Sequence, residues 1–192
     1  MKTNHYVSMS ALQVSVAVLA MAVVVVGSNV LVQYPINQWL TWGAISYPVA
    51  FLVADLINRR FGPSAARRVA AVGFIIAVVF SFWVATPRIA MASGMAFLVA
   101  QFLDIQVFDR LRHQAWWRAP FIGGAAGATL DTFVFFSLAF MGTGMDWMSL
   151  VVGDLAVKLA VNLALLAPFR ALMWNLARPA ESTESKPASA SL

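Results

Sequence analysis

Long runs of apolar residues, separated by short segments rich in arginine, dominate this chain. A helix needs about 20 mostly apolar residues to cross the hydrocarbon core of a membrane. The pattern therefore predicts an all-α integral membrane protein, built as a bundle of six transmembrane helices. The expected spans are Ala11–Val32, Leu40–Ile57, Ala66–Ala85, Ile89–Val107, Phe121–Phe140 and Leu150–Phe169.

The first two spans need separate arguments. Leu40–Ile57 is the shortest span and contains Pro48, which predicts a kinked or tilted helix. The first span contains the triplet Ala20–Ala22, which fits a signal-peptide cleavage site. However, its apolar run continues to Val26 with no polar region after it, so we expect an uncleaved helix.

The composition agrees with a membrane protein. Of the 192 residues, 61% are hydrophobic and 11% are charged, whereas a soluble domain usually has about 25% charged residues. The net charge of +5 comes from basic residues between the apolar runs, so nucleic acid is not an expected partner. The chain has no cysteine and its two histidines lie outside the apolar runs, so we expect no metal site and no cofactor.

Lysine and arginine are distributed unevenly between alternate loops. Eleven of the 13 lie on one side, Arg88 lies on the other, and Lys158 is inside the last apolar run. Because cytoplasmic loops carry the excess of basic residues, both termini are expected in the cytoplasm of a bacterial cell. We expect residues 1–178 to form one domain of the inner membrane and residues 179–192 to be a disordered cytoplasmic tail. The eleven are Lys2, Arg59, Arg60, Arg67, Arg68, Arg110, Arg112, Arg118, Arg170, Arg178 and Lys186.

Several polar side chains lie within or at the ends of the apolar runs. A charge at the centre of a bilayer costs at least about 2.5–3.5 kcal/mol. We therefore expect these groups to face the inside of the bundle or a watered cavity. They are Asp55, Asp104, Asp131, Asp154 and Lys158, accompanied by Asn29, Gln101 and Asn162.

Spacing places some of these groups on shared helix faces. Asp154, Lys158 and Asn162 are each four residues apart and form one polar stripe. Asp154 and Lys158 can pair directly, either as a gate or as a structural ion pair, and both readings stay open. Gln101 and Asp104 share another face, where Asp104 is either a ligand contact or an interfacial charge.

Asp131 lies near the middle of its span, the most costly depth. Gly123 and Gly127 precede it at the small-xxx-small spacing that lets helices approach closely, which turns Asp131 inward. Asp55 is either functional or an interfacial charge beside arginines. Asn29 is either a helix–helix hydrogen-bonding group or a ligand contact.

Some functional classes lack their motifs here. The chain has no P-loop, so it carries no ATPase of that type. An intramembrane aspartyl protease usually shows Tyr-Asp and Gly-x-Gly-Asp. The nearest match, Val151–Asp154, lacks the first glycine, and no Tyr-Asp occurs. We therefore do not expect an enzyme.

Several short segments match one known family in order and spacing. Tyr47–Asp55 is followed by Phe61-Gly62, Ala66–Arg68, Arg88–Ser93, Gln101–Asp104, Val107-Phe108, Trp116-Trp117, Asp131-Thr132 and the pair Asp154 and Lys158. From about Asn29 to Phe169, the chain thereby resembles the queuosine-precursor transporters, which form part of the small vitamin-uptake-transporter family.

The resemblance implies a six-helix bundle similar to the substrate-binding subunits of energy-coupling-factor transporters. It also implies import of the deazaguanine bases preQ0 and preQ1 for queuosine salvage. One carboxylate can accept both the ring N–H and the exocyclic amine of such a base, and aromatic rings can stack on it. The expected substrate contacts are Asp131, Gln101, Asp104, Asn29, Phe97 and Phe135, with Asp55 and Asn162 as further candidates.

Alternatives stay open at this point. Within transport, the substrate is another small vitamin or nucleobase. In a different class, the chain is a non-transporting assembly subunit or an intramembrane enzyme. We expect a monomer or homodimer that works alone in the lipid bilayer, while docking to a separate energising module stays open.

Overall fold

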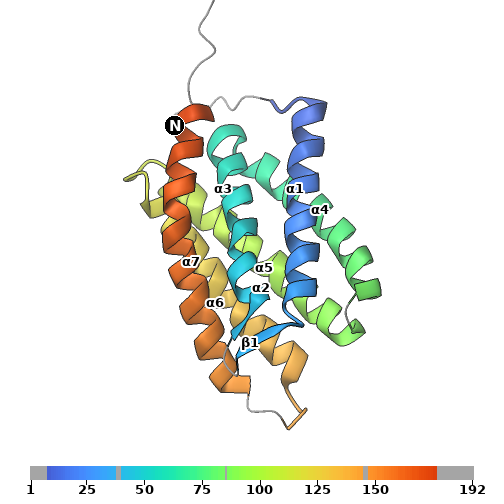
Figure 1. Ribbon diagram of the computed structural model, residues 1–192. Helices are drawn as coiled ribbons and strands as arrows, with labels where there is room; N and C mark the ends of the chain where they lie inside the picture. Colours follow the sequence, from blue (N-terminus) through green and yellow to red (C-terminus); the bar gives the residue numbers. More distant parts are fainter. Residues whose placement is uncertain (1–7, 38–39, 85, 145–146, 177–192) are drawn as a thin grey trace, which may run out of the picture.

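A computed structural model describes residues 8–37, 40–84, 86–144 and 147–176, so the predicted tail at 179–192 lies outside the described residues. Long helices run up and down the molecule beside one short β-hairpin (Figure 1). The hairpin strands are β1 Pro35–Asn37 and β2 Leu40–Thr41. The helices are α1 Ala11–Leu31, α2 Trp42–Ser46, α3 Pro48–Phe61, α4 Pro63–Val84, α5 Pro87–Leu111, α6 Arg118–Phe140 and α7 Trp147–Leu176.

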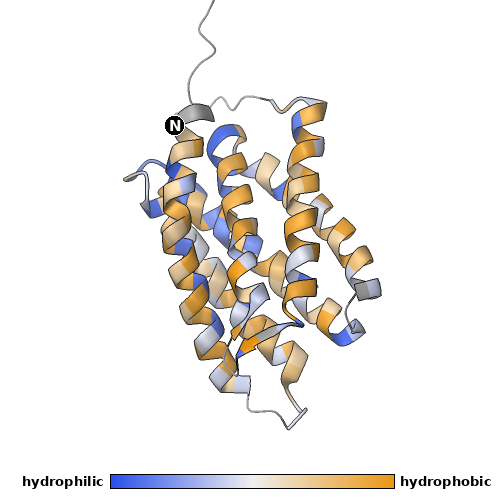
Figure 2. Ribbon diagram, in the orientation of Figure 1, coloured by the Kyte–Doolittle hydropathy of each residue, from blue (hydrophilic) through white to orange (hydrophobic). Residues whose placement is uncertain are grey.

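Five of these helices, α1, α4, α5, α6 and α7, are long and apolar enough to cross a membrane. Most of their length is coloured as hydrophobic residues in Figure 2. Large apolar side chains such as Leu12 and Trp83 are 74% and 76% exposed. Exposed apolar surface on this scale suits contact with lipid rather than water. The protein is therefore a multi-pass membrane protein.

The second expected span differs from the prediction. Leu40 does not begin a helix, because β2 pairs with β1 in an antiparallel hairpin, with Pro35 opposite Thr41. The helical part is divided into α2 and α3 at Pro48, whose nitrogen has no hydrogen to donate. Tyr47 between them keeps helical backbone angles of φ −60° and ψ −40°, so the two pieces follow one another closely. A proline break of this kind was expected from the sequence.

Small residues bring α5 and α6 together. Their facing surfaces are buried and rich in alanine and glycine. At Gly127 an added Cβ would lie 2.7 Å from the ring of Phe51 and 3.2 Å from the carbonyl oxygen of Ala100. The close helix packing predicted from the small-xxx-small spacing is therefore present, and α6 packs closely against α3 and α5 at Gly127.

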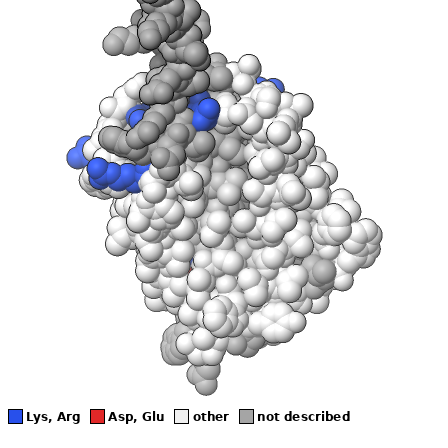
Figure 3. Space-filling view, turned by 45° about the horizontal axis from the view of Figure 1, so that its top comes forward, with Lys and Arg blue, Asp and Glu red and all other residues white. Residues whose placement is uncertain are grey.

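Basic side chains gather at one end of the bundle. Figure 3 shows lysine and arginine at the end where α1 begins and α7 ends, while the rest of the visible face is uncharged. The junction of α3 with α4 and the junction of α5 with α6 contribute these residues. The loops that carry most of the lysine and arginine residues in the sequence thus lie at the same end of the bundle.

Replacing Gly127 with alanine should lower the stability of the bundle. The added methyl group overlaps Phe51 and the Ala100 carbonyl, and overpacking of this kind costs about 1–3 kcal/mol. Thermal unfolding of the purified protein in detergent measures the change. Gly27→Ala in α1 is the matched control, because its added Cβ meets nothing within 4 Å. Equal unfolding temperatures for both variants would contradict the close packing of α6.

Candidate functional site

Three charged side chains meet inside the bundle, between α6 and α7. The Nζ atom of Lys158 lies 2.6 Å from Asp154 Oδ2 and 2.9 Å from Asp131 Oδ2. All three residues are at most 6% exposed. The pairing of Asp154 with Lys158 was expected from their spacing. The contact with Asp131 joins two helices and was not expected.

Two hydroxyl groups complete the hydrogen bonding of this ion cluster, which consists of Asp131, Asp154 and Lys158. The phenol of Tyr47 donates to Asp131 Oδ1 at 2.7 Å. The hydroxyl of Thr132 donates to Asp154 Oδ2 at 2.8 Å and accepts from Lys158 at 3.2 Å. A buried charge is tolerated when it is both paired and hydrogen-bonded, and these contacts meet that condition.

The break at Pro48 brings a third structural element to the cluster. Tyr47 lies at the junction of α2 and α3, and its ring packs edge-on against Phe51 and Phe97, with centroids 5.9 and 6.2 Å away. Lys158 Nζ lies 5.1 Å from the centre of the same ring, within range of a cation–π contact. Tyr47 thus links the divided helix to α5, α6 and α7.

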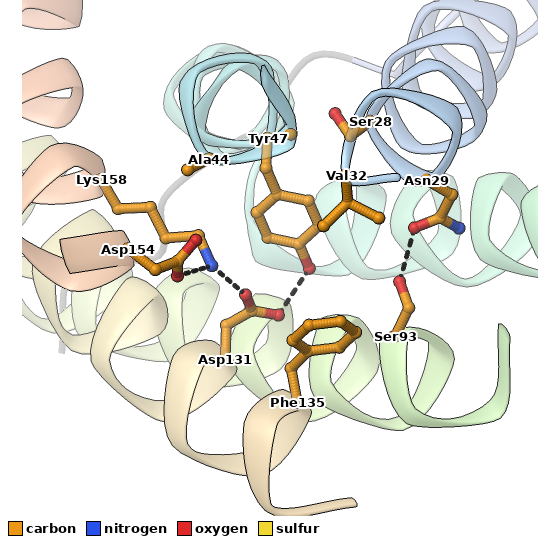
Figure 4. Close-up of a pocket in the computed structure, with 11 residues that line it drawn as sticks. Ser28, Asn29, Val32, Ala44, Tyr47, Ser93, Asp131, Phe135, Asp154 and Lys158 are labelled. Carbon is orange, nitrogen blue, oxygen red and sulfur yellow. Dashed lines mark hydrogen bonds and ion pairs between the residues drawn. The ribbon is translucent and has the colours of Figure 1, made fainter. Parts of the chain in front are cut away.

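Asn29 forms a second polar group, which joins α1 to α4 and α5. Its Nδ2 donates to Ser81 at 2.6 Å, and its Oδ1 accepts from Ser93 at 2.6 Å. Nearby, Ser28 and Ser46 are hydrogen-bonded at 2.9 Å. Figure 4 shows Asn29 and Ser93 across the pocket from the ion cluster, with Tyr47, Val32 and Phe135 between them.

The ion cluster and the Asn29 group line one pocket. Its free volume is about 30 Å³, room for about one or two water molecules. Pockets that hold small molecules are usually about 300–1,000 Å³. The pocket therefore has a contracted form in this structure, and a molecule of that size would fit only if it widened. The lining consists of Ser28, Asn29, Val32, Gly43, Ala44, Tyr47, Ser93, Asp131, Phe135, Asp154 and Lys158.

The remaining expected site residues lie away from this lining. Asp55, Gln101 and Asp104 form a separate inner polar group, which is buried and lies further toward the basic end of α3 and α5. Phe97 is not part of the lining, but its ring packs edge-on against Tyr47, which is. Asn162 donates to the carbonyl of Phe121 at 3.0 Å. Spacing along the sequence therefore grouped the polar residues of each helix. In the structure, these residues form two groups at different distances from the basic end of the bundle.

Several pocket residues were not proposed as ligand contacts from the sequence. Ser28, Ser93 and the backbone around Gly43 line the pocket, and Thr132 supports its charges. Serine and threonine are common in membrane helices, so they do not stand out from an apolar run. The signal that was available is the proline break after Tyr47, because interrupted helices at membrane depth are tolerated where they line a cavity.

Replacing Lys158 with methionine should strongly destabilise the protein. The substitution keeps the length of the side chain but leaves two buried carboxylates without their cation, and breaking a buried ion pair costs about 3–5 kcal/mol. Thermal unfolding in detergent is the measurement. Leu163→Met on the outward face of the same helix is the control, since Leu163 is 59% exposed. Equal stability of both variants would mean that Lys158 does not neutralise the cluster.

Comparison with known proteins supplies the family. A family model described as a putative vitamin uptake transporter matches residues 41–86 and 81–173. These ranges include α3, α4, α5, α6 and almost all of α7, and thus every residue of the ion cluster. No solved structure is a significant match.

Individual relatives carry a more specific name. A queuosine precursor transporter of Escherichia coli (strain K12) is 32% identical, over 80% of this chain and 82% of that protein. A probable queuosine precursor transporter of Haemophilus influenzae (strain ATCC 51907 / DSM 11121 / KW20 / Rd) is 35% identical, over 71% of this chain and 69% of that protein. A probable queuosine precursor transporter of Bacillus subtilis (strain 168) is 25% identical, over 64% of this chain and 67% of that protein. The chain therefore belongs to the vitamin uptake transporter family, in the group that contains the queuosine precursor transporters.

Proposed function

We propose that this transporter imports queuosine precursors, the deazaguanine bases preQ0 and preQ1, for queuosine salvage. The names of its relatives support this substrate. The structural observation that carries the proposal is the pocket in which a buried, hydrogen-bonded carboxylate faces an asparagine and an aromatic ring. The proposed ligand contacts are Asp131, Asn29 and Phe135.

The chemistry of the pocket suits a deazaguanine. Asp131 can accept from the ring N–H and the exocyclic amine, once Tyr47 or Lys158 releases one of its oxygens. The amide of Asn29 can both donate and accept at the opposite edge of the base. Phe135 and Tyr47 offer faces for the flat ring.

The charge of the cluster favours a ligand rich in donors. Two carboxylates surround one ammonium group, so the ionised cluster carries one net negative charge. An anionic substrate would meet an uncompensated carboxylate, which costs free energy in a buried site. A neutral base with several N–H groups, or the aminomethyl form with an ammonium group, does not meet this penalty.

Gln101, Asp104 and Phe97 were also expected from the sequence as substrate contacts. In the contracted form they do not line the pocket, and the same is true of Asp55 and Asn162. We propose that the base binds first among Asn29, Asp131 and Phe135. Asp154 and Lys158 hold Asp131 in place. The pair is thereby proposed to act both as a structural ion pair and as a gate.

We further propose the architecture and location that the sequence predicts. The α2–α3 unit forms the sixth crossing, so that the bundle resembles the substrate-binding subunits of energy-coupling-factor transporters. The basic end and both termini face the cytoplasm, and the protein lies in a bacterial inner membrane. It works as a monomer or homodimer without its own ATPase and catalyses no chemical reaction.

Purified protein should be stabilised by deazaguanine bases and not by guanine, riboflavin or biotin. A ligand that binds only the folded state stabilises it by about 2.7 kcal/mol at a hundredfold excess over its dissociation constant. Asp131→Asn should remove this stabilisation, because it removes the carboxylate that accepts the two base donors. Thermal shift with and without each ligand is the measurement.

The control for binding is Leu163→Met, which should respond to the ligands as the wild type does. Stabilisation by another vitamin or nucleobase instead would move the substrate and keep the importer. No response to any of these ligands would count against an importer of this type and favour an assembly subunit. A chemical conversion of the ligand would favour an intramembrane enzyme.

The crossing by α2–α3 is testable because the chain contains no cysteine. We expect Ile36→Cys, in the hairpin before α2, to react with a membrane-impermeant thiol reagent added to intact cells. Ser64→Cys, just after α3, should react only after the cells are opened, as should Gln114→Cys between α5 and α6. Labelling of Ile36→Cys and Ser64→Cys from the same side would show that α2–α3 does not cross.

A further inference from the structure

The inner polar group has buried atoms that nothing in the described part of the structure satisfies. Asp104 and Gln101 are 0% exposed and Asp55 is 3% exposed. Both carboxylate oxygens of Asp104, both amide atoms of Gln101 and Oδ1 of Asp55 have no hydrogen-bond partner among the described residues. Gln101 and Asp104 share one face of α5, one helical turn apart. Native proteins rarely leave so many buried polar atoms unpaired, so a bound species is expected here.

The neighbouring cations are engaged elsewhere. Lys158 of α7 contacts Asp131 and Asp154, while Arg112, the residue just after α5, contacts Asn58 and the carboxylate of Asp109. Arg59 of α3 donates to the carbonyl of Arg112. The remaining arginines on the packed helices α4, α6 and α7 are exposed at the basic end: Arg67, Arg68, Arg118 and Arg170.

Asp55 and Asp104 are thus buried carboxyl groups for which the described residues show no ion pair. They come from α3 and α5 and lie close enough to affect one another electrostatically. Two like charges in a buried site without a cation are strongly unfavourable. At least one of the two carboxyl groups must be neutralised by a bound proton or metal cation.

The available space selects between these two species. Gly123 packs directly on Asp104, since an added Cβ would lie 2.6 Å from Asp104 Oδ1. The cavity beside Asp55 has a free volume of about 10 Å³, at the lower limit for one water molecule. A sodium ion that kept water ligands would need more space than this cavity offers. A proton requires no space.

We propose that Asp55 and Asp104 form a proton-binding site, separate from the substrate pocket, that couples proton influx to import. This inference rests on the proposed transport function. In the cycle, one carboxyl group takes a proton from the outer side while the pocket is loaded. It releases that proton to the cytoplasm when the inner group opens to water.

Helix α6 connects the two sites. Gly123, Gly127 and Asp131 follow one another at intervals of four residues and lie on one face. Gly123 contacts Asp104 of the proton site, Gly127 contacts Phe51, and Asp131 belongs to the substrate pocket. A shift of α6 that widens the pocket would therefore also change the space around Asp104. This shared face is the physical basis for coupling.

The first test is direct and requires no transport. A protonated carboxyl group gives an infrared C=O stretching band that a carboxylate does not give. Wild-type protein in an alkyl-glycoside detergent, which has no carbonyl group, should show this band at neutral pH, and Asp104→Asn or Asp55→Asn should reduce it. Asp109→Asn is the control on the same helix, because the side chain of Asp109 is 37% exposed and paired with Arg112. A spectrum without the band, or one unchanged in both variants, overturns the proposal.

The second test measures coupling in proteoliposomes. The nitrile base preQ0 is the substrate, since it has no amine whose charge changes with pH. A gradient of one pH unit, acidic outside, should allow up to about tenfold accumulation per proton. Asp104→Asn should still bind the base and exchange it across the membrane, but should accumulate none in response to the gradient. Asp109→Asn should behave as the wild type does.

The outcomes separate the two proposals. Accumulation by Asp104→Asn equal to that of the wild type overturns the proton site, as does accumulation that follows a sodium gradient. A retained infrared band in protein that binds no deazaguanine would overturn the substrate assignment and support the proton site.

Discussion

The contact of Lys158 with two carboxylates is the interaction on which the centre of the bundle depends. None of its three members could be buried alone without a large loss of stability. Together they hold α6 against α7. Through the hydrogen bond of Tyr47 to Asp131, they also hold the junction of α2 and α3 in place. The pocket that we propose for the substrate is the space that remains beside this cluster. Its position therefore follows from the need to neutralise buried charge.

Close packing makes that arrangement possible. Polar side chains can meet inside a membrane bundle only when the helix backbones approach one another, and glycine and alanine allow this on α5 and α6. Gly124 faces the amide of Asn162 in the same way as Gly123 faces Asp104. These glycines thus have two roles: they allow close helix contacts, and they leave room for the polar side chains of neighbouring helices. An account based on packing alone would miss this role.

The sequence predicted the parts of the structure that depend on local pattern. The long apolar runs gave five spans, because each exceeds the length required by the bilayer. The spacing of Asp154 and Lys158 gave their contact, because residues four apart share a helix face. The hairpin before α2 was missed, because the β2 residues Leu40 and Thr41 look like the start of an apolar run. The partner of Asp131 was also missed, since helix order along the chain does not tell which faces meet.

The separation of two polar groups by depth is the feature that sequence could least reveal. Asp104 and Asp131 are both buried aspartates, yet Asp131 has an ammonium and a phenol as partners and Asp104 has neither. We therefore propose two different roles for the same type of side chain, decided by what the neighbouring helices supply. A paired carboxylate keeps its charge and can receive donors from a ligand. An unpaired carboxylate must be neutralised before it can remain buried, and this requirement makes it suited to bind and release a proton.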